Sequence, residues 1–314
     1  MPPKELPIVV EPTKEPCFYL VTCGLCDEQE TCQKDQDGHA HWLVKKRMDS
    51  IGAKILVMSN KGGVGKSSVT TNLAACLKLK GYRVGIADID IHGPNIPKMF
   101  GCEKGRFKQD PGGGMAPVQA HNIALASMGF LIDDPDLAIV WRDAYKYEFI
   151  NQLLGGVNWG ALDFLLVDLP PGTGNESITT MDFIGDVTGA VIVTTPQDVA
   201  LLDSRKSVTF VKDSEFQVIG IVENMSGWTC EHCGQLSSLF KTGGGERAAK
   251  DLDVPFLGRI PMDPDLMASC DRGLPYVLSA GDSPTAKAFQ DVADKVENFA
   301  KQSVGLCAGS PEKR

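Results

Sequence analysis

The stretch that decides the fold begins with Lys54-Ile55-Leu56-Val57-Met58-Ser59 and continues at residues 61–67 as KGGVGKS. The apolar run predicts a strand, and the glycine-rich turn after it leads into a helical segment that ends at Gly81. A strand, a turn and a helix in this order form the context that a phosphate-binding P-loop requires. Glycines let consecutive backbone N–H groups surround phosphate oxygens, and the start of the helix adds partial positive charge. The sequence therefore predicts a nucleotide site in which Lys66 reaches the β- and γ-phosphates and Ser67 binds Mg²⁺.

Further apolar runs follow along the chain, and most of them are continuous rather than alternating. They span residues 83–88, 123–128, 162–168, 190–195, 218–223 and 256–260. Continuous runs are typical of strands buried on both faces, as in a parallel sheet. Helical segments separate several of these runs, so we expect a doubly wound α/β domain with a mainly parallel sheet over residues 51–300. Residues 1–50 are predicted to form a cysteine-rich arm with little core of its own and a helix from His41 to Met48. Residues 301–314 are predicted to form a flexible tail.

Composition excludes several classes of function. The 314 residues contain 31 Lys and Arg against 40 Asp and Glu, a net charge of −9, which disfavours generic nucleic-acid binding. No run of roughly twenty apolar residues is present, so we expect no membrane-spanning helix. The first residues contain acids and prolines without an apolar segment, so we expect no signal peptide and a cytoplasmic protein. Ten cysteines in a reducing compartment are poor candidates for a disulfide framework, and the clustering of six of them indicates metal or redox chemistry.

Three aspartates lie where predicted strands end. Asp168 closes the run 162–168 and is followed by Leu169 and then Pro-Pro-Gly-Thr-Gly. Asp88 closes the run 83–88, and Asp90 follows it two residues later. A carboxylate at the end of such a strand can orient the ligands of Mg²⁺. Taken alone, Asp88 or Asp90 is better explained as part of a turn or a helix cap. Together with the P-loop, the functional interpretation is favoured.

The additional lysine at the start of the loop, Lys61, resembles the deviant Walker A motif K-G-G-x-G-K-[ST] of the partition, septum-positioning, arsenite-pump and Mrp-type ATPases. The resemblance implies that Lys61 reaches across a dimer to the nucleotide of the partner. It also implies that Asp90 orients the attacking water and that Asp88 assists at the metal. In this family adenine is held at positions that match the segments Glu223-Asn224-Met225-Ser226 and Pro261-Met262-Asp263, and an asparagine such as Asn224 can pair with adenine through two hydrogen bonds.

The segment after Asn224 narrows the resemblance. Residues 223–233 fit E-N-M-S-G-x-x-C-x-x-C, the pattern of the Mrp-type iron–sulfur carriers. Cys230 and Cys233 provide two thiolates, whereas a [4Fe–4S] cube binds four. A two-fold dimer would supply all four on its axis. A zinc site, a redox pair and a chance pair stay open, and zinc is the main rival because thiolate sulfur suits both metals.

A second group of cysteines lies near the start of the chain, where Cys23, Cys26 and Cys32 form a C-x2-C-x5-C run. This run resembles that of the eukaryotic cytosolic iron–sulfur assembly scaffold, which has a fourth cysteine further upstream. Cys17 takes that place here, with a shorter gap than the family pattern has. His39 or His41 is an alternative to Cys17, and zinc is again the rival metal.

These resemblances imply an ATPase, with slow turnover, that assembles [4Fe–4S] clusters and transfers them to cytosolic and nuclear apo-proteins. They imply a homodimer or a hetero-oligomer with a related ATPase, with no nucleic-acid or membrane partner. The alternative is a zinc-bound deviant Walker A ATPase of the positioning or membrane-insertion type. The implied catalytic residues are Lys61, Lys66 and Asp90, and the implied Mg²⁺ ligands are Ser67, Asp88 and Asp168. The implied ATP contacts are Asn60, Lys61, Gly62, Gly63, Val64, Gly65, Lys66, Ser67, Ser68, Asn224, Pro261 and Asp263. The implied cluster ligands are Cys17, Cys23, Cys26 and Cys32 in the arm and Cys230 with Cys233 across the dimer.

Overall fold

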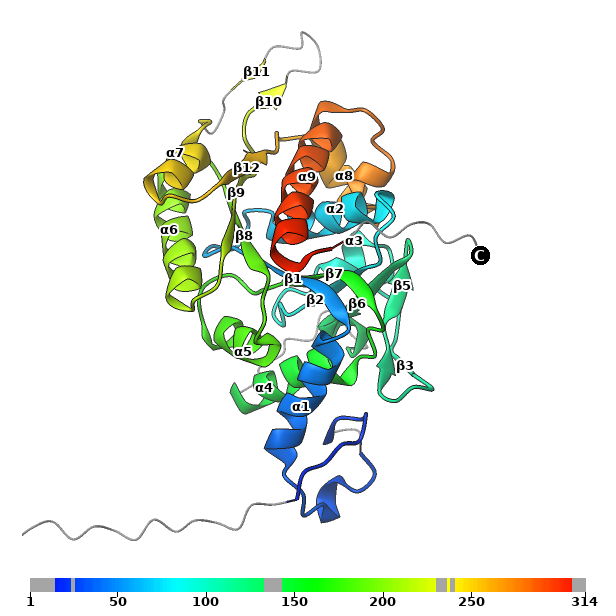
Figure 1. The fold of residues 1–314 in the computed structure, drawn as a ribbon. Helices are drawn as coiled ribbons and strands as arrows, with labels where there is room; N and C mark the ends of the chain where they lie inside the picture. The colour runs from blue at the N-terminus through cyan, green and yellow to red at the C-terminus, as the bar shows by residue number, and fades with distance from the viewer. Residues whose placement is uncertain (1–14, 24–25, 133–142, 230–235, 238–240, 307–314) are drawn as a thin grey trace, which may run out of the picture.

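The computed structural model describes residues 15–23, 26–132, 143–229, 236–237 and 241–306. Its centre is an eight-stranded sheet in the order β12-β9-β8-β1-β7-β2-β6-β5 (Figure 1). Neighbouring strands are parallel except β5, which pairs antiparallel with β6 at the edge. Every apolar run that the sequence singled out forms a strand of this sheet, which confirms the predicted α/β fold. The strands are β1 (Ile51–Met58), β2 (Val84–Asp88), β5 (Val118–Ala120), β6 (Ile123–Ser127), β7 (Leu162–Asp168), β8 (Gly189–Thr194), β9 (Val218–Glu223) and β12 (Phe256–Arg259).

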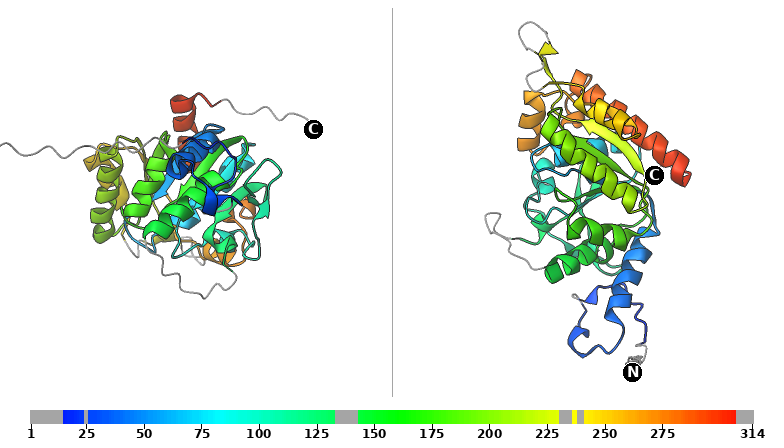
Figure 2. Two further views of the ribbon diagram at one scale, coloured as in Figure 1. Left: turned by 90° about the horizontal axis from the view of Figure 1, so that it is seen from below. Right: turned by 90° about the vertical axis from the view of Figure 1, so that its left-hand side faces the viewer.

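Helices cover both faces of the sheet. One layer contains α2 and α9, and the other contains α1 and α4 to α7 (Figures 1 and 2). In β1, Ile55 and Val57 pack toward the first layer, while Leu56 and Met58 pack toward the second, which explains the continuous apolar run. The helices are α1 (Gln36–Met48), α2 (Lys66–Leu79), α3 (Ile96–Met99), α4 (Asp143–Asn151), α5 (Asn175–Ile184), α6 (Asp198–Asp213), α7 (Gly244–Asp251), α8 (Pro264–Asp271) and α9 (Pro284–Val304).

Helix α1 joins the cysteine arm to the body. It begins five residues before the predicted start, because the Asp35 side chain caps it by accepting from the backbone N–H of Gly38 at 2.9 Å. Leu43, Val44 and Met48 are buried, and the latter two belong to the same apolar cluster as β1. The last part of the arm is therefore a piece of the main core. At the other boundary, α9 continues four residues past position 300.

Short elements complete the described structure. They are the antiparallel pairs β3 (Lys108–Gln109) with β4 (Met115–Ala116) and β10 (Trp228–Thr229) with β11 (Leu236–Ser237), and the single turns of helix η2 (Gln29–Thr31), η3 (Met128–Phe130), η4 (Gln152–Gly156) and η5 (Tyr276–Leu278). The cysteine arm and the β10–β11 pair lie at opposite ends of the molecule (Figures 1 and 2). The arm cysteines therefore lie at the end of the molecule opposite to the β10–β11 pair.

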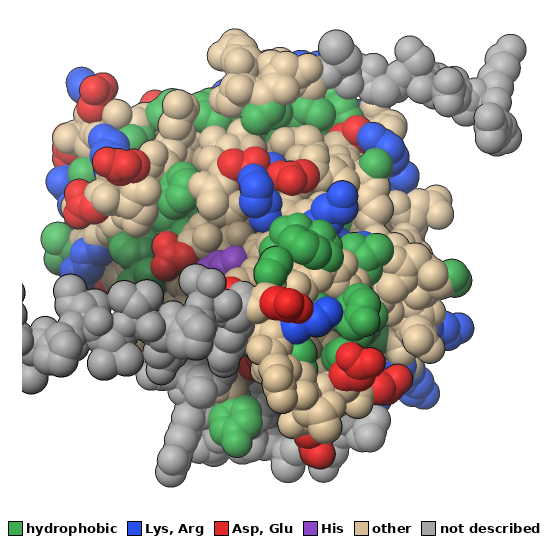
Figure 3. Space-filling view, turned by 60° about the horizontal axis from the view of Figure 1, so that its bottom comes forward, with side chains coloured by type: hydrophobic (Ala, Val, Ile, Leu, Met, Phe, Trp, Pro, Cys, Tyr) green, Lys and Arg blue, Asp and Glu red, His purple; other side chains and the backbone are tan. Residues whose placement is uncertain are grey.

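The charge on the surface and the apolar length of the helices are relevant to nucleic-acid and membrane partners. The end of the molecule that carries the arm shows acidic and basic side chains interspersed with apolar ones, without a continuous basic face in this view (Figure 3). Within the described ranges, no helix is both long enough and apolar enough to cross a bilayer.

Candidate nucleotide and metal sites

The P-loop occupies the turn between β1 and α2. Gly63 and Gly65 have φ angles of 78° and 82°, a left-handed conformation that favours glycine. A Cβ atom at Gly65 would lie only 2.1 Å from Nδ2 of Asn224, so the close approach of these two segments also requires glycine. Asn224 holds the loop from the other side, since its Nδ2 donates to the carbonyl of Val64 at 2.9 Å. The loop and the end of β9 are therefore directly connected.

Lys66 and Ser67 open α2 and meet Asp168 at the end of β7. Lys66 Nζ lies 2.7 Å from Asp168 Oδ2, and Ser67 Oγ donates to the same oxygen at 2.7 Å. Thr70, about one helical turn after Lys66, donates to Asp168 Oδ1 at 2.5 Å. Asp168 is fully buried, so these three donors fix the orientation of its carboxylate.

Two more carboxylates stand beside this group. Asp88 and Asp168 are direct partners in the parallel pairing of β2 with β7. Ser127 Oγ, at the end of β6, donates to Asp88 Oδ2 at 2.8 Å. Burial and the adjacent Asp168 carboxylate raise the pKa of Asp88 well above its ordinary range. Asp90 is partly buried with Oδ2 4.0 Å from Lys66 Nζ, and burial also raises the pKa of Asp90.

The donor set suits Mg²⁺. Lys66 carries one positive charge against the three carboxylates, and the hydroxyl of Ser67 adds a further hard oxygen. Among the described residues, no three His, Cys, Asp or Glu side chains are arranged to hold a metal ion by themselves. Mg²⁺ usually takes one or two carboxylates and fills its remaining positions with water and phosphate oxygens. Ser67, Asp88 and Asp168 therefore fit a magnesium site that is completed by a nucleotide.

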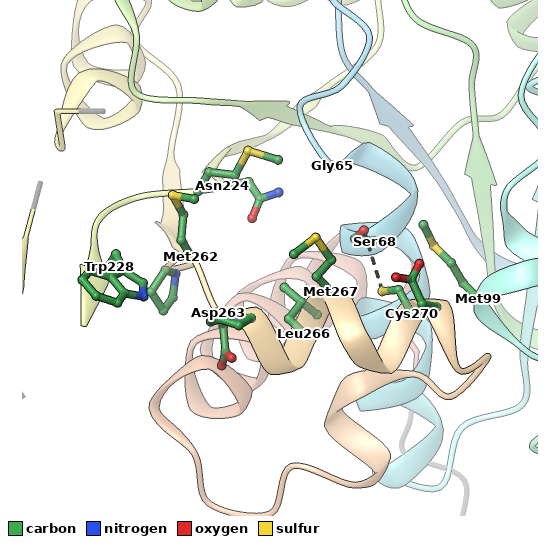
Figure 4. Close-up of a pocket in the computed structure, with 14 residues that line it drawn as sticks. Gly65, Ser68, Met99, Asn224, Trp228, Met262, Asp263, Leu266, Met267 and Cys270 are labelled. Carbon is green, nitrogen blue, oxygen red and sulfur yellow. Dashed lines mark hydrogen bonds between the residues drawn. The ribbon is translucent and has the colours of Figure 1, made fainter. Parts of the chain in front are cut away.

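Two cavities flank the P-loop. The smaller, about 160 Å³, is lined by the loop itself together with Asp90, Asn95 and Pro171. The larger, about 500 Å³, lies between the start of α2 and helix α8 (Figure 4). Its lining is mostly apolar, and four of its residues are methionines: Met99, Met225, Met262 and Met267. A polar loop cavity beside an apolar cavity matches the two ends of a nucleotide, its phosphates and its base.

Most of the predicted nucleotide contacts line these cavities. Asn224, Pro261 and Asp263 line the larger one. Asp263 also caps α8, because its carboxylate accepts from the backbone N–H of Asp265 at 2.9 Å. Asn60 is absent from both linings, since its Nδ2 donates instead to Asp203 on α6 at 3.2 Å. The remaining predicted residues, from Lys61 to Ser68, all line the smaller cavity.

The four cysteines of the arm come together in one small pocket. Cys17 is buried, while Cys23, Cys26 and Cys32 are partly buried. Burial, and then charge repulsion from the other three thiols, raise the pKa of Cys23 to about 11. The thiols line the pocket without closing around a single point. A four-iron cube takes one thiolate at each iron, so its ligands stand farther apart than those of one ion, and the number and type of donors fit a cube.

His39 is the additional donor in this pocket. It is 3% exposed, and its Nδ1 lies 3.3 Å from Cys23 Sγ. Its Nε2 lies 2.8 Å from the carbonyl oxygen of Tyr19. His41 is exposed and faces Tyr147 and Phe183 instead. Of the two histidines that the sequence left open, the structure brings only His39 to the thiols.

Cys230 and Cys233 lie outside the described residues. The chain enters that segment from β10 and leaves it through β11. At its described base, the buried carboxylate of Glu223 accepts hydrogen bonds from Ser226 Oγ and from the backbone N–H groups of Gly243 and Gly245. Asn224, which holds the P-loop, is the residue directly after Glu223. The P-loop and the base of the β10–β11 pair are therefore held by neighbouring residues.

The comparisons with known proteins identify the family. A family model described as ParA, NUBPL iron-transfer P-loop NTPase, matches residues 50–297. The chain belongs to this family. Iron–sulfur cluster carrier proteins are similar to this chain over most of its length: that of Methanocaldococcus jannaschii is 43% identical over 276 residues, covering 87% of this chain and 94% of the relative. That of Pyrococcus abyssi is 45% identical over 272 residues, covering 83% and 91%.

Solved structures agree with this family. A nucleotide-binding protein from Archaeoglobus fulgidus, determined in complex with ADP, is 40% identical with a TM-score of 0.66 and covers 74% of this chain and 91% of its own. The cell-division ATPase MinD of Pyrococcus furiosus is 25% identical with a TM-score of 0.58, covering 79% and 99%. Membership in the family makes this chain a P-loop NTPase of the iron–sulfur cluster carrier type.

Several residues of the sites were not found from the sequence. Thr70 had a signal, because its spacing from Lys66 places both on one face of the predicted helix. Ser127 had none, since its partner Asp88 lies 39 positions away along the chain. Glu223 was part of the E-N-M-S-G pattern, but nothing in the sequence indicated its bond to Gly245, 22 positions away. Hydroxyls and carboxylates of this kind are recognised only when the topology brings their partners together.

Proposed function

We propose that this protein is an ATP-dependent scaffold that assembles [4Fe–4S] clusters and transfers them to cytosolic and nuclear apo-proteins. The observation that carries the proposal is the presence of a complete P-loop site and a four-thiol pocket in one chain of an iron–sulfur carrier family. The thiol pocket belongs to the segment by which the chain resembles the eukaryotic cytosolic scaffold. The archaeal carriers and the ADP complex support the nucleotide part of the proposal.

We expect slow ATP hydrolysis, and the geometry supplies the residues for the reaction. The P-loop N–H groups and Lys66 would hold the β- and γ-phosphates, and Ser67, Asp88 and Asp168 would hold Mg²⁺ among them. Asp90 lies on the wall of the phosphate cavity and would orient the attacking water. Lys66 is paired with Asp168 at 2.7 Å, so ATP and Mg²⁺ would have to draw it toward the phosphates. The base would lie among the methionines and Asn224.

Two chains would complete the carrier. Lys61 is exposed at the entrance of the loop. In a dimer it would reach the nucleotide of the second copy, and its positive charge would stabilise phosphoryl transfer. Cys230 and Cys233 would pair with their counterparts and hold the cargo cluster on the two-fold axis. ATP binding would change the dimer geometry and so gate the loading or release of the cargo. A homodimer and a dimer with a related ATPase both satisfy this requirement.

The arm would hold a second, resident cluster through Cys17, Cys23, Cys26 and Cys32. When bound, such a cluster supplies one-electron chemistry. The arm lies at the far end of the molecule from β10 and β11, so this cluster and the cargo would occupy separate positions.

Metal analysis after anaerobic purification tests the proposal. We expect iron and acid-labile sulfide in equal amounts, and cluster transfer to an apo-ferredoxin that depends on ATP. The double variants Cys230→Ala/Cys233→Ala and Cys23→Ala/Cys26→Ala assign iron to each site, and Cys76→Ala/Cys102→Ala is the matched control because neither of those thiols lines the arm pocket. Zinc without sulfide in both sites would refute the proposal and favour a zinc-bound ATPase of the positioning or membrane-insertion type.

A further inference from the structure

His39 is held in one orientation by its surroundings. It lies in the first turn of α1, stacks on Trp42 with ring centroids 6.0 Å apart, and is 3% exposed. The carbonyl of Tyr19 can only accept, so Nε2–H donates that 2.8 Å hydrogen bond. In the tautomer with its proton on Nε2, Nδ1 carries the lone pair of the ring, and it lies 3.3 Å from Cys23 Sγ. The lone pair of Nδ1 therefore points at the position of a cysteine sulfur.

The hydrogen bond from Nε2 is the one that metal-binding histidines usually make with the ring nitrogen that does not bind the metal. Histidines that ligate metals almost always donate their other ring N–H to a carboxylate, a backbone carbonyl or water, which fixes the ring and the tautomer. Here that second bond already exists, and its acceptor lies in the chain between Cys17 and Cys23. The hydrogen bond between Tyr19 and His39 thus connects the segment that carries Cys17 and Cys23, here called the thiol loop, to helix α1.

The distance to Cys23 also fits a shared metal position. Bonds of about 2.3 Å to sulfur and about 2.0 Å to nitrogen let either of two donors up to roughly 4 Å apart bind a metal at one position, without both binding at once. The observed separation of Nδ1 and Sγ is 3.3 Å. An iron that Cys23 can bind is consequently within reach of His39 as well.

We propose that His39 is a metal ligand of the arm, able to bind through Nδ1 the same iron that Cys23 binds. The inference rests on the proposed arm cluster and adds a fifth donor to its four thiols. Four donors satisfy a cube, so Cys23 and His39 compete for one corner, and the cluster has a thiolate form and a histidine form. Replacing a thiolate by a neutral imidazole raises the reduction potential of a cluster, so the two forms differ as electron carriers.

His41 provides the matched control. It lies in the same helix two residues further on, but it is exposed, and its Nε2 lies 3.3 Å from the hydroxyl of Tyr147. Its ring packs on Phe183 with centroids 5.0 Å apart. Removing His41 takes away a histidine from α1 without touching the thiol pocket.

The test uses the full chain carrying Cys230→Ala/Cys233→Ala, so that iron reports on the arm alone. After anaerobic reconstitution with iron and sulfide, we expect Cys23→Ala to keep at least half of the parent iron, whereas Cys26→Ala loses it. Adding His39→Ala to Cys23→Ala should remove the remaining iron, and adding His41→Ala should not. The reduced Cys23→Ala protein should show strong nitrogen coupling in pulsed electron paramagnetic resonance and a higher reduction potential than the parent.

The inference is overturned if Cys23→Ala loses iron as completely as Cys26→Ala, or if the Cys23→Ala/His39→Ala protein keeps it. An iron-free parent would instead show that the proposed arm cluster itself is wrong. Binding of ATP by every variant controls for folding, because the nucleotide site lies in the body of the protein.

Discussion

Arg47 connects the cysteine arm to the body of the protein, and its replacement should weaken this connection. Its buried guanidinium makes four hydrogen bonds: to the carbonyls of Gly155 at 3.3 Å, Leu20 at 3.2 Å and Gly113 at 2.7 Å, and to Asn158 Oδ1 at 2.8 Å. Leu20 belongs to the thiol loop, whereas the other three belong to the body. One side chain therefore joins the cysteine arm to two distant segments.

The magnitude follows from those bonds. Losing a hydrogen bond to a charged group costs about 1.5–3 kcal/mol. Four such losses would overstate the effect, because the site disfavours the charge: burial lowers the pKa of Arg47, against the opposing influence of Asp110. Burying this charge costs free energy, so its removal offsets several kcal/mol of the stability that the lost hydrogen bonds provided. We expect Arg47→Met to lower the free energy of unfolding by about 3–4 kcal/mol, since breaking a buried charged network has this size of effect.

Urea denaturation followed by circular dichroism measures this loss. With a slope near 3 kcal/mol per molar, the midpoint should fall by about 1 M. Arg47→Lys keeps the charge but loses the planar fork, so it should recover less than half of the loss. Lys46→Met is the matched control, because Lys46 is the exposed neighbour on α1, and it should stay within about 0.5 kcal/mol of the wild type.

A second readout concerns the arm. Because Arg47 holds Leu20, its loss should also lower the iron content of the arm, with little effect on ATP binding. If the urea midpoint of Arg47→Met equalled that of Lys46→Met, the proposed role of Arg47 in joining the arm to the body would be refuted. The expected loss of about 3–4 kcal/mol would then be refuted as well.

Two further predictions concern groups within the body. Thr70→Val removes the hydroxyl that donates to Asp168 at 2.5 Å, so we expect at least a tenfold higher Mg²⁺ requirement for ATP hydrolysis, and an unchanged Mg²⁺ titration would exclude the role of this hydroxyl. The pKa of Glu297 is lowered from the ordinary 4.5 to about 2. Burial by itself would raise this pKa, but hydrogen bonds from Lys301 and Lys80 lower it by more. A depressed carboxylate pKa stabilises the fold above the unfolded value, and this stabilisation is lost as the pH falls from 4.5 toward 2. Glu297→Gln should therefore flatten the stability profile in that window, and an unaltered acid limb would contradict the assignment.

The central sheet could be predicted from the sequence because its strands are buried on both faces. Every residue of β1 from Ile55 to Met58 packs into one helix layer or the other, so this part of the strand carries an uninterrupted apolar signal. The edge strand β5 (Val118–Ala120) was missed because it has a partner on one side only and its residues are partly exposed. Short, half-solvated strands give too weak a pattern to predict.

The candidate sites divide in the same way. The positions of the P-loop between β1 and α2 and of Asp168 at the end of β7 were predictable, because they follow from glycine spacing and from the end of an apolar run. The choice between His39 and His41 was not, because it depends on which face of α1 meets the thiols, and contacts with Tyr19 and Phe183 decide that. The helix itself was predicted too short, because the cap at Asp35 lies among polar residues that carry no periodic signal.

The most direct test of the account is native mass spectrometry of the iron-loaded, ATP-bound chain with the arm emptied by Cys26→Ala/Cys32→Ala. The account predicts a pair of chains that carries a single [4Fe–4S] cluster between them. Both the cluster and the pairing should weaken together in Cys230→Ala/Cys233→Ala. A complete cluster bound at that site by a solitary chain would contradict it.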